Sequence, residues 1–206
     1  PALTQSSGIP RLSTLAACEK VVSETAERLG GLDILVNNAG ASMFGPFLDL
    51  PDSAFVDAIN GKLLAYIRTI KAAVPYMETR GEGAILNVTG ATQHAVPLHT
   101  PGAVCCAALR LLSKELSIEL APYKIRVNSI APAPIWTART ARMQEVRAKA
   151  WGTPVEQVIK ELEASVPLGR LGTPDDIGYA VCFLVSGRAS FISGAAVSID
   201  GAYTPV

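Results

Sequence analysis

Short apolar runs alternate with helical stretches along this sequence, and this alternation restricts the possible folds more than any other feature. The runs that predict strands are residues 32–36, 84–88, 124–130 and 195–199. The stretches between them carry apolar residues at helical spacing and predict helices at residues 15–29, 52–80, 102–120, 138–164 (one or two helices) and 173–184. Strands that are apolar throughout are buried on both faces, which is typical of a parallel sheet covered by helices. We therefore expect a doubly wound α/β fold with three layers, α/β/α.

Local signals indicate where some of these elements begin and end. Asp52 can cap the second helix, and Pro75 is expected to bend it or to end part of it. Pro132 is expected to end the third strand. Either Thr173 or Asp175 can cap the last helix.

Length and charge exclude several classes of protein. The chain has 206 residues, of which 49% are hydrophobic, so it can bury one core, and we expect a single domain over residues 1–206. Residues 1–13 show no sustained period and are expected to be irregular. The 18 basic residues balance the 18 acidic ones, which leaves no field to attract nucleic acid. The apolar runs are far shorter than the roughly 20 residues that span a bilayer, so no membrane partner is expected.

The four cysteines indicate free thiols. They have neither the density of a disulfide scaffold nor the spacing of a metal site. The neighbours Cys105 and Cys106 point in different directions on any regular element, so they cannot jointly hold a metal. We expect no metal site, and a cytoplasmic location where thiols stay reduced.

Several segments, spread from about residue 15 to the C-terminus, together resemble the short-chain dehydrogenase/reductase family, in particular its members that are similar to 3-oxoacyl-(acyl carrier protein) reductases. Residues 32–40 contain the strand-ending Asn-Asn-Ala-Gly motif of that family, and residues 85–89 match the strand that leads to its catalytic Ser. Residues 120–132 resemble its Ile-Arg-Val-Asn segment. The usual tail of the family matches residues 167–177, 183–184, 192–194 and 200–201. The resemblance implies a Rossmann-like fold.

The resemblance also implies a nicotinamide cofactor, NAD or NADP, at the carboxyl ends of the strands. The positions that would contact it are Asn37, Asn38, Ala39 and Gly40 on the adenosine side, and Pro132, the Ile135 backbone and the Thr137 hydroxyl around the nicotinamide carboxamide. Ala133 stands where the family has Gly. The alternative for residues 37–40 is a simple turn after a strand.

The opening segment of the family has no counterpart in this sequence. Family members begin with a strand, a Gly-rich turn and a helix whose N-terminus holds the pyrophosphate. No Gly-x-x-x-Gly-x-Gly occurs here. We therefore expect that an N-terminal βαβ part, on the order of 50 to 60 residues, is absent from this chain.

The proton-transfer residues of the family are also replaced. Its Tyr falls on Gly102 and its Lys on Cys106, and neither side chain can take the role of the residue it replaces. Its Ser falls on Thr89 or Gly90, depending on the loop length.

The Asn of the family's helix falls on Lys62, and an ammonium there suggests a different proton relay. The hypothesis is that Lys62 and Thr89, with help from His94 or His99, exchange the proton that hydride transfer requires. The alternative is that Lys62 pairs with a carboxylate or solvent and that both histidines are ordinary loop residues.

These observations predict an NAD(P)-dependent oxidoreductase that acts on a small carbonyl or alcohol with a non-standard catalytic set. The alternative is a catalytically silent homologue that binds nucleotide or forms an oligomer. The resemblance implies a homodimer or homotetramer paired through residues 53–80 and 102–120. Residues 138–166, with Met143 and Trp151, are expected to form a lid over a small-molecule substrate.

Overall fold

The computed structural model describes residues 12–40, 42–90 and 95–204. The strands are β1 (Ile34–Asn37), β2 (Gly83–Val88), β3 (Ile125–Pro132) and β4 (Ala196–Ile199). The α-helices are α1 (Leu15–Leu29), α2 (Asp52–Ala58), α3 (Leu64–Arg80), α4 (Thr100–Glu119), α5 (Ala138–Trp151), α6 (Val155–Ala164) and α7 (Pro174–Val185). Short helical turns lie at η1 (Phe47–Asp49), η2 (Ile59–Leu63), η3 (Ala121–Tyr123) and η4 (Gly187–Ala189).

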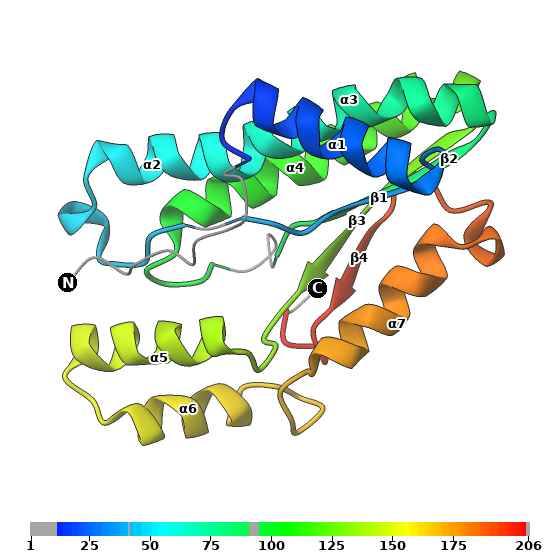
Figure 1. Cartoon of the computed structure of the whole chain (residues 1–206). Coiled ribbons are helices and arrows are strands. Elements are labelled where there is room, and N and C mark those ends of the chain that lie inside the picture. Colours follow the sequence, from blue (N-terminus) through cyan, green and yellow to red (C-terminus); the bar gives the residue numbers. More distant parts are fainter. Residues whose placement is uncertain (1–11, 41, 91–94, 205–206) are drawn as a thin grey trace.

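The strands form one parallel sheet in the order β1-β2-β3-β4. Helices α1, α3 and α4 cover one face of the sheet and α7 covers the other, while α5 and α6 lie beyond the carboxyl ends of the strands (Figure 1). The predicted Rossmann-like α/β fold with a helix-covered parallel sheet is confirmed.

Two apolar clusters hold these layers together. On the α1 and α3 side the buried members are Val22, Ala26, Leu32, Ile70, Ala73, Met77, Ile85, Ile125 and Val127. On the α7 side Leu86 and Ile130 pack against Leu184. Because successive strand residues point to opposite faces, Ile85 and Leu86 belong to different clusters, which is why the apolar residues of β2 are consecutive and do not alternate with polar ones.

A buried chain of polar side chains crosses β1 and β2. The Thr69 hydroxyl donates to Asn37 Oδ1 over 2.8 Å, and Asn37 Nδ2 donates to Asn87 Oδ1 over 3.0 Å. Asn87 Nδ2 in turn donates to Ser113 Oγ over 2.9 Å. Buried polar groups are costly unless they are paired, and this network pairs them while it connects α3 and α4 to the sheet.

The structure corrects two details of the sequence analysis and confirms a third. The stretch predicted as one helix over residues 52–80 is interrupted by the π-helical turn η2, and α3 continues through Pro75. Asp52 does not cap α2, because it is the first helical residue and Pro51 occupies the cap position. Pro132 ends β3 as its last residue, as the sequence analysis expected.

The predicted cap of the last helix is confirmed at Thr173. Its hydroxyl accepts from the Asp176 N–H, and the Asp176 carboxylate accepts from the Thr173 N–H, which is a capping box. Across the described part of the chain, no helix has the length and apolar character needed to cross a membrane.

Candidate functional site

The carboxyl ends of β1, β2 and β3 open into a cavity of about 640 Å³. Helices α5 and α7, the turn η2 and the start of α4 complete its wall. Ligands of open α/β sheets bind at this end of the strands, so the cavity lies where the fold predicts a site.

Five of the seven expected cofactor positions line this cavity: Asn38, Gly40, Pro132, Ile135 and Thr137. The other two, Asn37 and Ala39, line a separate cavity of about 190 Å³ between β1 and α1. The amide of Asn37 is buried and engaged with Thr69 and Asn87, so its contribution here is to fix the end of β1.

The segment that follows β3 is held by its own side chains. Thr137 caps α5, because its hydroxyl accepts from the Thr140 N–H over 3.2 Å. The Thr140 hydroxyl donates back to the Ile135 carbonyl. A short parallel bridge to Gly172 fixes the same segment from the other side. The Thr137 hydroxyl and the Ile135 backbone therefore lie in a preorganised turn at the cavity.

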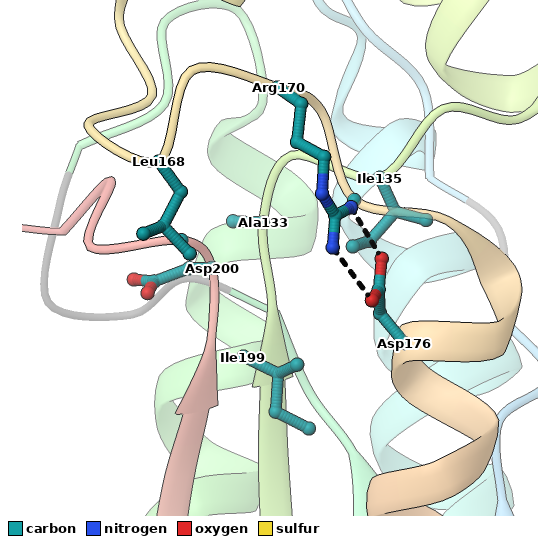
Figure 2. A pocket seen from close by; sticks show the side chains of 9 residues that line it. Ala133, Ile135, Leu168, Arg170, Asp176, Ile199 and Asp200 are labelled. Atoms are coloured by element: carbon teal, nitrogen blue, oxygen red, sulfur yellow. Dashed lines mark hydrogen bonds and ion pairs between the residues drawn. The ribbon is translucent and has the colours of Figure 1, made fainter.

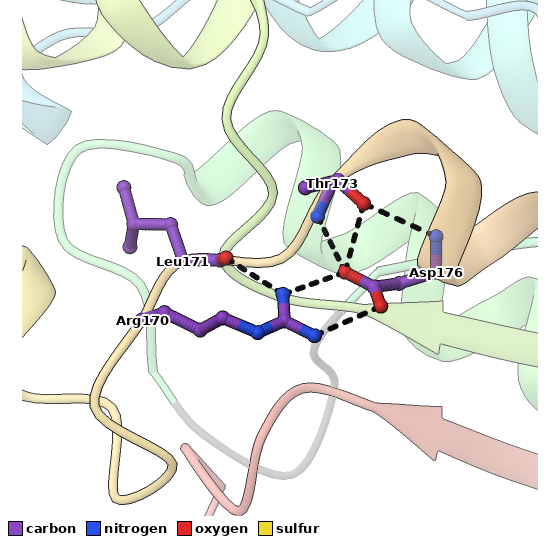
Figure 3. Close-up of polar contacts among 4 residues, drawn as sticks. All are labelled: Arg170, Leu171, Thr173 and Asp176. Carbon is purple, nitrogen blue, oxygen red and sulfur yellow. Dashed lines mark hydrogen bonds and ion pairs between the residues drawn. The ribbon is translucent and has the colours of Figure 1, made fainter.

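A bidentate ion pair braces the neighbouring wall. Arg170 donates to both carboxylate oxygens of Asp176 over 2.7 and 2.9 Å, beside a small cavity of about 120 Å³ that Ile135 also lines (Figure 2). The same carboxylate accepts from the N–H and the hydroxyl of Thr173 (Figure 3). These donors, with Arg170 the strongest, hold the pKa of Asp176 well below its usual range. The contacts fix the start of α7, whose residues Pro174, Ile177 and Gly178 line the large cavity.

Lys62 reaches the cavity from the π-helical turn η2. Its Nζ donates to the Thr89 carbonyl over 2.9 Å and lies 5.8 Å from the centre of the Tyr66 ring. A single π-helical turn within a helix, in which backbone hydrogen bonds join residues five apart, is frequent at functional sites. The interruption that separates α2 from α3 thus lies at the residue that the sequence singled out.

Thr89 lies at the end of β2 and is buried. Its hydroxyl donates to the Ile130 carbonyl over 2.9 Å, while its own carbonyl accepts from Lys62 and from the Cys106 thiol. Thr89, Gly90, Lys62 and Cys106 all line the large cavity. The structure brings together the residues that the sequence analysis proposed for a relay.

Tyr66 is a nearby tyrosine that the sequence analysis did not consider. Its hydroxyl donates to the Val88 carbonyl over 3.1 Å, and burial, which is the main cause, raises its pKa above the ordinary range. Tyr66 therefore stays protonated at neutral pH.

His94 is outside the described residues, whereas His99 lines the same cavity as Lys62 and Thr89. Its Nε2 is 3.1 Å from the Ser42 hydroxyl, and its ring stacks on Phe44 with 4.7 Å between ring centres. Burial, which is the main cause, and the nearby cations Arg139, Lys62 and Arg147 together lower the pKa of His99 to about 4. At neutral pH the imidazole is uncharged.

Two arginines of α5 were missed by the sequence analysis. Arg139 and Arg147 line the cavity, with Met143 between them. The three residues follow one another at intervals of four, which places them on one face of a helix. This spacing is the sequence signal that could have revealed them.

Comparisons with known proteins agree with this geometry. Residues 12–204 match the family model described as enoyl-(acyl carrier protein) reductase. The chain is 34% identical over 194 residues to a 3alpha-hydroxysteroid dehydrogenase of Mediterraneibacter gnavus, covering 94% of this chain and 73% of that protein.

Two solved structures are similar in fold as well as sequence. An NAD⁺-bound xylitol dehydrogenase is 28% identical with a TM-score of 0.88, covering 93% of this chain and 76% of that one. An actinorhodin polyketide ketoreductase with NADPH is 26% identical with a TM-score of 0.90, covering 95% and 76%. Both similar chains belong to proteins whose structures were determined with a nicotinamide cofactor.

Proposed function

Because this chain belongs to the short-chain dehydrogenase/reductase family, we propose that it is an NAD(P)-dependent oxidoreductase that acts on the alcohol or carbonyl group of a small molecule. The observation that carries this proposal is the cavity of about 640 Å³, which is lined both by five of the seven expected cofactor positions and by Lys62, Thr89 and His99. When bound, the nicotinamide cofactor supplies or accepts the hydride.

The residues of the cavity fit the nicotinamide end of such a cofactor. The Thr137 hydroxyl and the Ile135 backbone would hold a carboxamide, since they lie in a turn that is already fixed by Thr140 and Gly172. Gly40 and Asn38, at the end of β1, would lie toward the rest of the nucleotide. This arrangement supports the assignment of NAD or NADP without distinguishing between them.

Lys62 is our candidate for the proton donor. A carbonyl oxygen that receives a hydride at its carbon must take up a proton, and oxidation of the alcohol reverses that transfer. One N–H of Lys62 is engaged by the Thr89 carbonyl, which fixes the ammonium at the cavity and leaves its other protons to a substrate oxygen. The Thr89 hydroxyl, whose proton goes to Ile130, can accept from a substrate alcohol.

His99 is the second polar group that this proposal uses. As a neutral imidazole bonded to Ser42, it can take up a proton at one ring nitrogen while it releases a proton from the other, which adds no net charge to a site that already contains cations. It would connect the substrate oxygen with the Ser42 hydroxyl.

Cofactor titration followed by an activity screen tests the proposal. The chain should quench or enhance NADH or NADPH fluorescence on binding and should oxidise the bound cofactor with at least one member of a panel of ketones and aldehydes. Binding with no turnover on a broad panel would favour the silent homologue. An absence of binding by both cofactors would contradict the proposal.

We further propose that the chain forms a homodimer or homotetramer through α2, α3 and α4. On α4 the exposed apolar residues Val104, Leu111 and Ile118 recur every seven positions and form one stripe. Light scattering should give at least twice the monomer mass, and Leu111→Glu should lower the measured mass. A monomeric wild type would contradict the proposed oligomer.

We propose a cytoplasmic location, because the four cysteines are free thiols.

A further inference from the structure

The cavity is strongly positive although the protein as a whole has no net charge. Lys62, Arg139 and Arg147 line it, and none of the described residues around it is Asp or Glu. Within the described residues the ion pairs join Lys20 to Glu24, Arg80 to Asp33 and Arg170 to Asp176, and none of them involves a cation that lines this cavity. A cavity with charges of one sign concentrates ligands of the other sign.

Arg147 is the buried residue among these three cations. Only 7% of the residue is exposed, and one guanidinium nitrogen donates to Gln144 Oε1 over 3.1 Å. Its guanidinium also lies 5.9 Å from the centre of the Trp151 ring. Gln144, itself 1% exposed, is held by its bond to the Thr140 carbonyl. The guanidinium is thus positioned by neutral groups and forms no ion pair with a described carboxylate.

Burial of a charge without a counter-charge is expensive, so such a guanidinium is expected to have an anionic partner in the functional state. Arg has a planar set of donors that matches a carboxylate with two parallel hydrogen bonds. Gln144 uses one donor and leaves the others for a ligand.

The position of Arg147 separates it from the nucleotide end of the cavity. Arg139, eight residues earlier on α5, donates to the Gly40 carbonyl beside the cofactor positions. The rise of a helix places the two residues roughly 12 Å apart along α5. Met143 lies between them, and Ile177, Val181 and Leu162 add apolar wall. A ligand that reaches Arg147 from the cofactor end would therefore cross an apolar section.

We propose that the substrate is an oxo or hydroxy acid, with a short apolar body and a carboxylate that Arg147 binds. This rests on the proposed function, since the carbonyl or alcohol end would lie at Lys62 and His99 while the carboxylate lies at the far end of α5. A single carboxylate suits the one buried guanidinium, and the apolar section suits a chain of a few carbons.

Calorimetric titration with hexanoate and hexanamide tests the carboxylate site independently of catalysis. The two probes have the same length and differ in charge. The full chain should bind hexanoate at least about tenfold more tightly than hexanamide, because hydrogen bonds between two charged groups are stronger than hydrogen bonds to a neutral group. Arg147→Gln should remove most of that preference, and Arg147→Lys should keep part of it. Arg142→Gln, an exposed arginine of the same helix, should leave the preference unchanged.

Thermal unfolding of the wild-type chain with each probe is a second measurement that needs no variant. Hexanoate should raise the midpoint more than hexanamide does. Equal binding of the two probes, or an equal loss of preference in Arg142→Gln and Arg147→Gln, would overturn the carboxylate site. A failure to bind NADH and NADPH would instead overturn the proposed function, so the two failures are distinguishable.

Discussion

The imidazole of His99 occupies the space that a side chain at position 102 would need. A β-carbon built on Gly102 would collide with the imidazole ring, including Nε2. The stack on Phe44 and the contact with Ser42 hold the ring there. Position 102 is where the sequence analysis expects the Tyr of the family, and in this structure the His99 ring occupies the space beside it.

Gly102→Ala should destabilise the fold, against the usual effect of this substitution in a helix. Alanine in place of a helical glycine normally stabilises by about 0.5 to 1 kcal/mol. Here the collision with His99 should reverse the sign and cost about 1 to 3 kcal/mol, as overpacking does. Urea unfolding measures this change.

His99→Ala supplies the control for that experiment. In the His99→Ala background the space is open, and Gly102→Ala should be neutral or stabilising. An equal destabilisation in both backgrounds would show that His99 is not the obstacle.

His99 should make the protein less stable as the pH falls from about 6.5 to 4. Its pKa is about 4 in the folded chain, because burial and three nearby cations oppose its charge, against about 6.5 when unfolded. Above pH 6.5 the imidazole is neutral in both the folded and the unfolded chain, so the difference between its two pKa values has no effect on stability. Below it the unfolded chain binds the proton first, so stability is lost until the folded pKa is reached.

The variant His99→Phe should remove that dependence. Since the ring is partly exposed, we expect roughly 1 to 2 kcal/mol less loss between pH 7 and pH 4.5 in the variant than in the wild type. Denaturant unfolding at several pH values measures it. Parallel stability curves for the two proteins would contradict the lowered pKa.

Lys62→Ala should lower kcat by about 10² to 10⁴-fold with a substrate identified by the screen, as loss of a general acid does. Cofactor binding should change much less than kcat, since the Lys62 ammonium is held by the Thr89 carbonyl. Lys71→Ala is the matched control, because Lys71 is an exposed lysine of the neighbouring helix α3. An unchanged kcat in Lys62→Ala would exclude Lys62 as the proton donor.

Thr173→Ala should destabilise the chain by about 1 kcal/mol, because it removes the hydroxyl that caps α7. It should also raise the KM for substrate, since α7 forms part of the cavity wall. Thr79→Ala serves as the control, because Thr79 is exposed and its hydroxyl bonds only to a carbonyl one turn earlier. Equal effects of the two substitutions would indicate that the cap has no special role.

Cys182 should be the thiol that reacts first with an aromatic disulfide reagent. It is exposed and lines the cavity, whereas Cys18, Cys105 and Cys106 are buried. One fast thiol per chain is expected under native conditions, and four after unfolding. The fast phase should disappear in Cys182→Ser, and its persistence would show that another thiol is accessible.

The sequence by itself determined the fold and the membership of the family. Largely apolar strand runs such as residues 84–88 predict a sheet between two layers of helices, because a strand of a parallel sheet that is buried on both faces needs helices on both sides. The motif at residues 37–40 and the segment from Pro132 to Thr137 located the carboxyl edge of the sheet. Caps such as Thr173 could be predicted because their signal is local.

Only the tertiary structure decided what faces the cavity. The sequence could not show that the helix predicted over residues 52–80 contains a π turn at Lys62, because that depends on packing against α4. Nor could it show that His99 fills the space above Gly102, or that Arg147 is buried without an ionic partner in the described chain. Ser42 and Phe44 hold the His99 ring, and Arg147 faces a cavity built from several segments of the chain. These features depend on residues distant in sequence, about which local patterns carry no information.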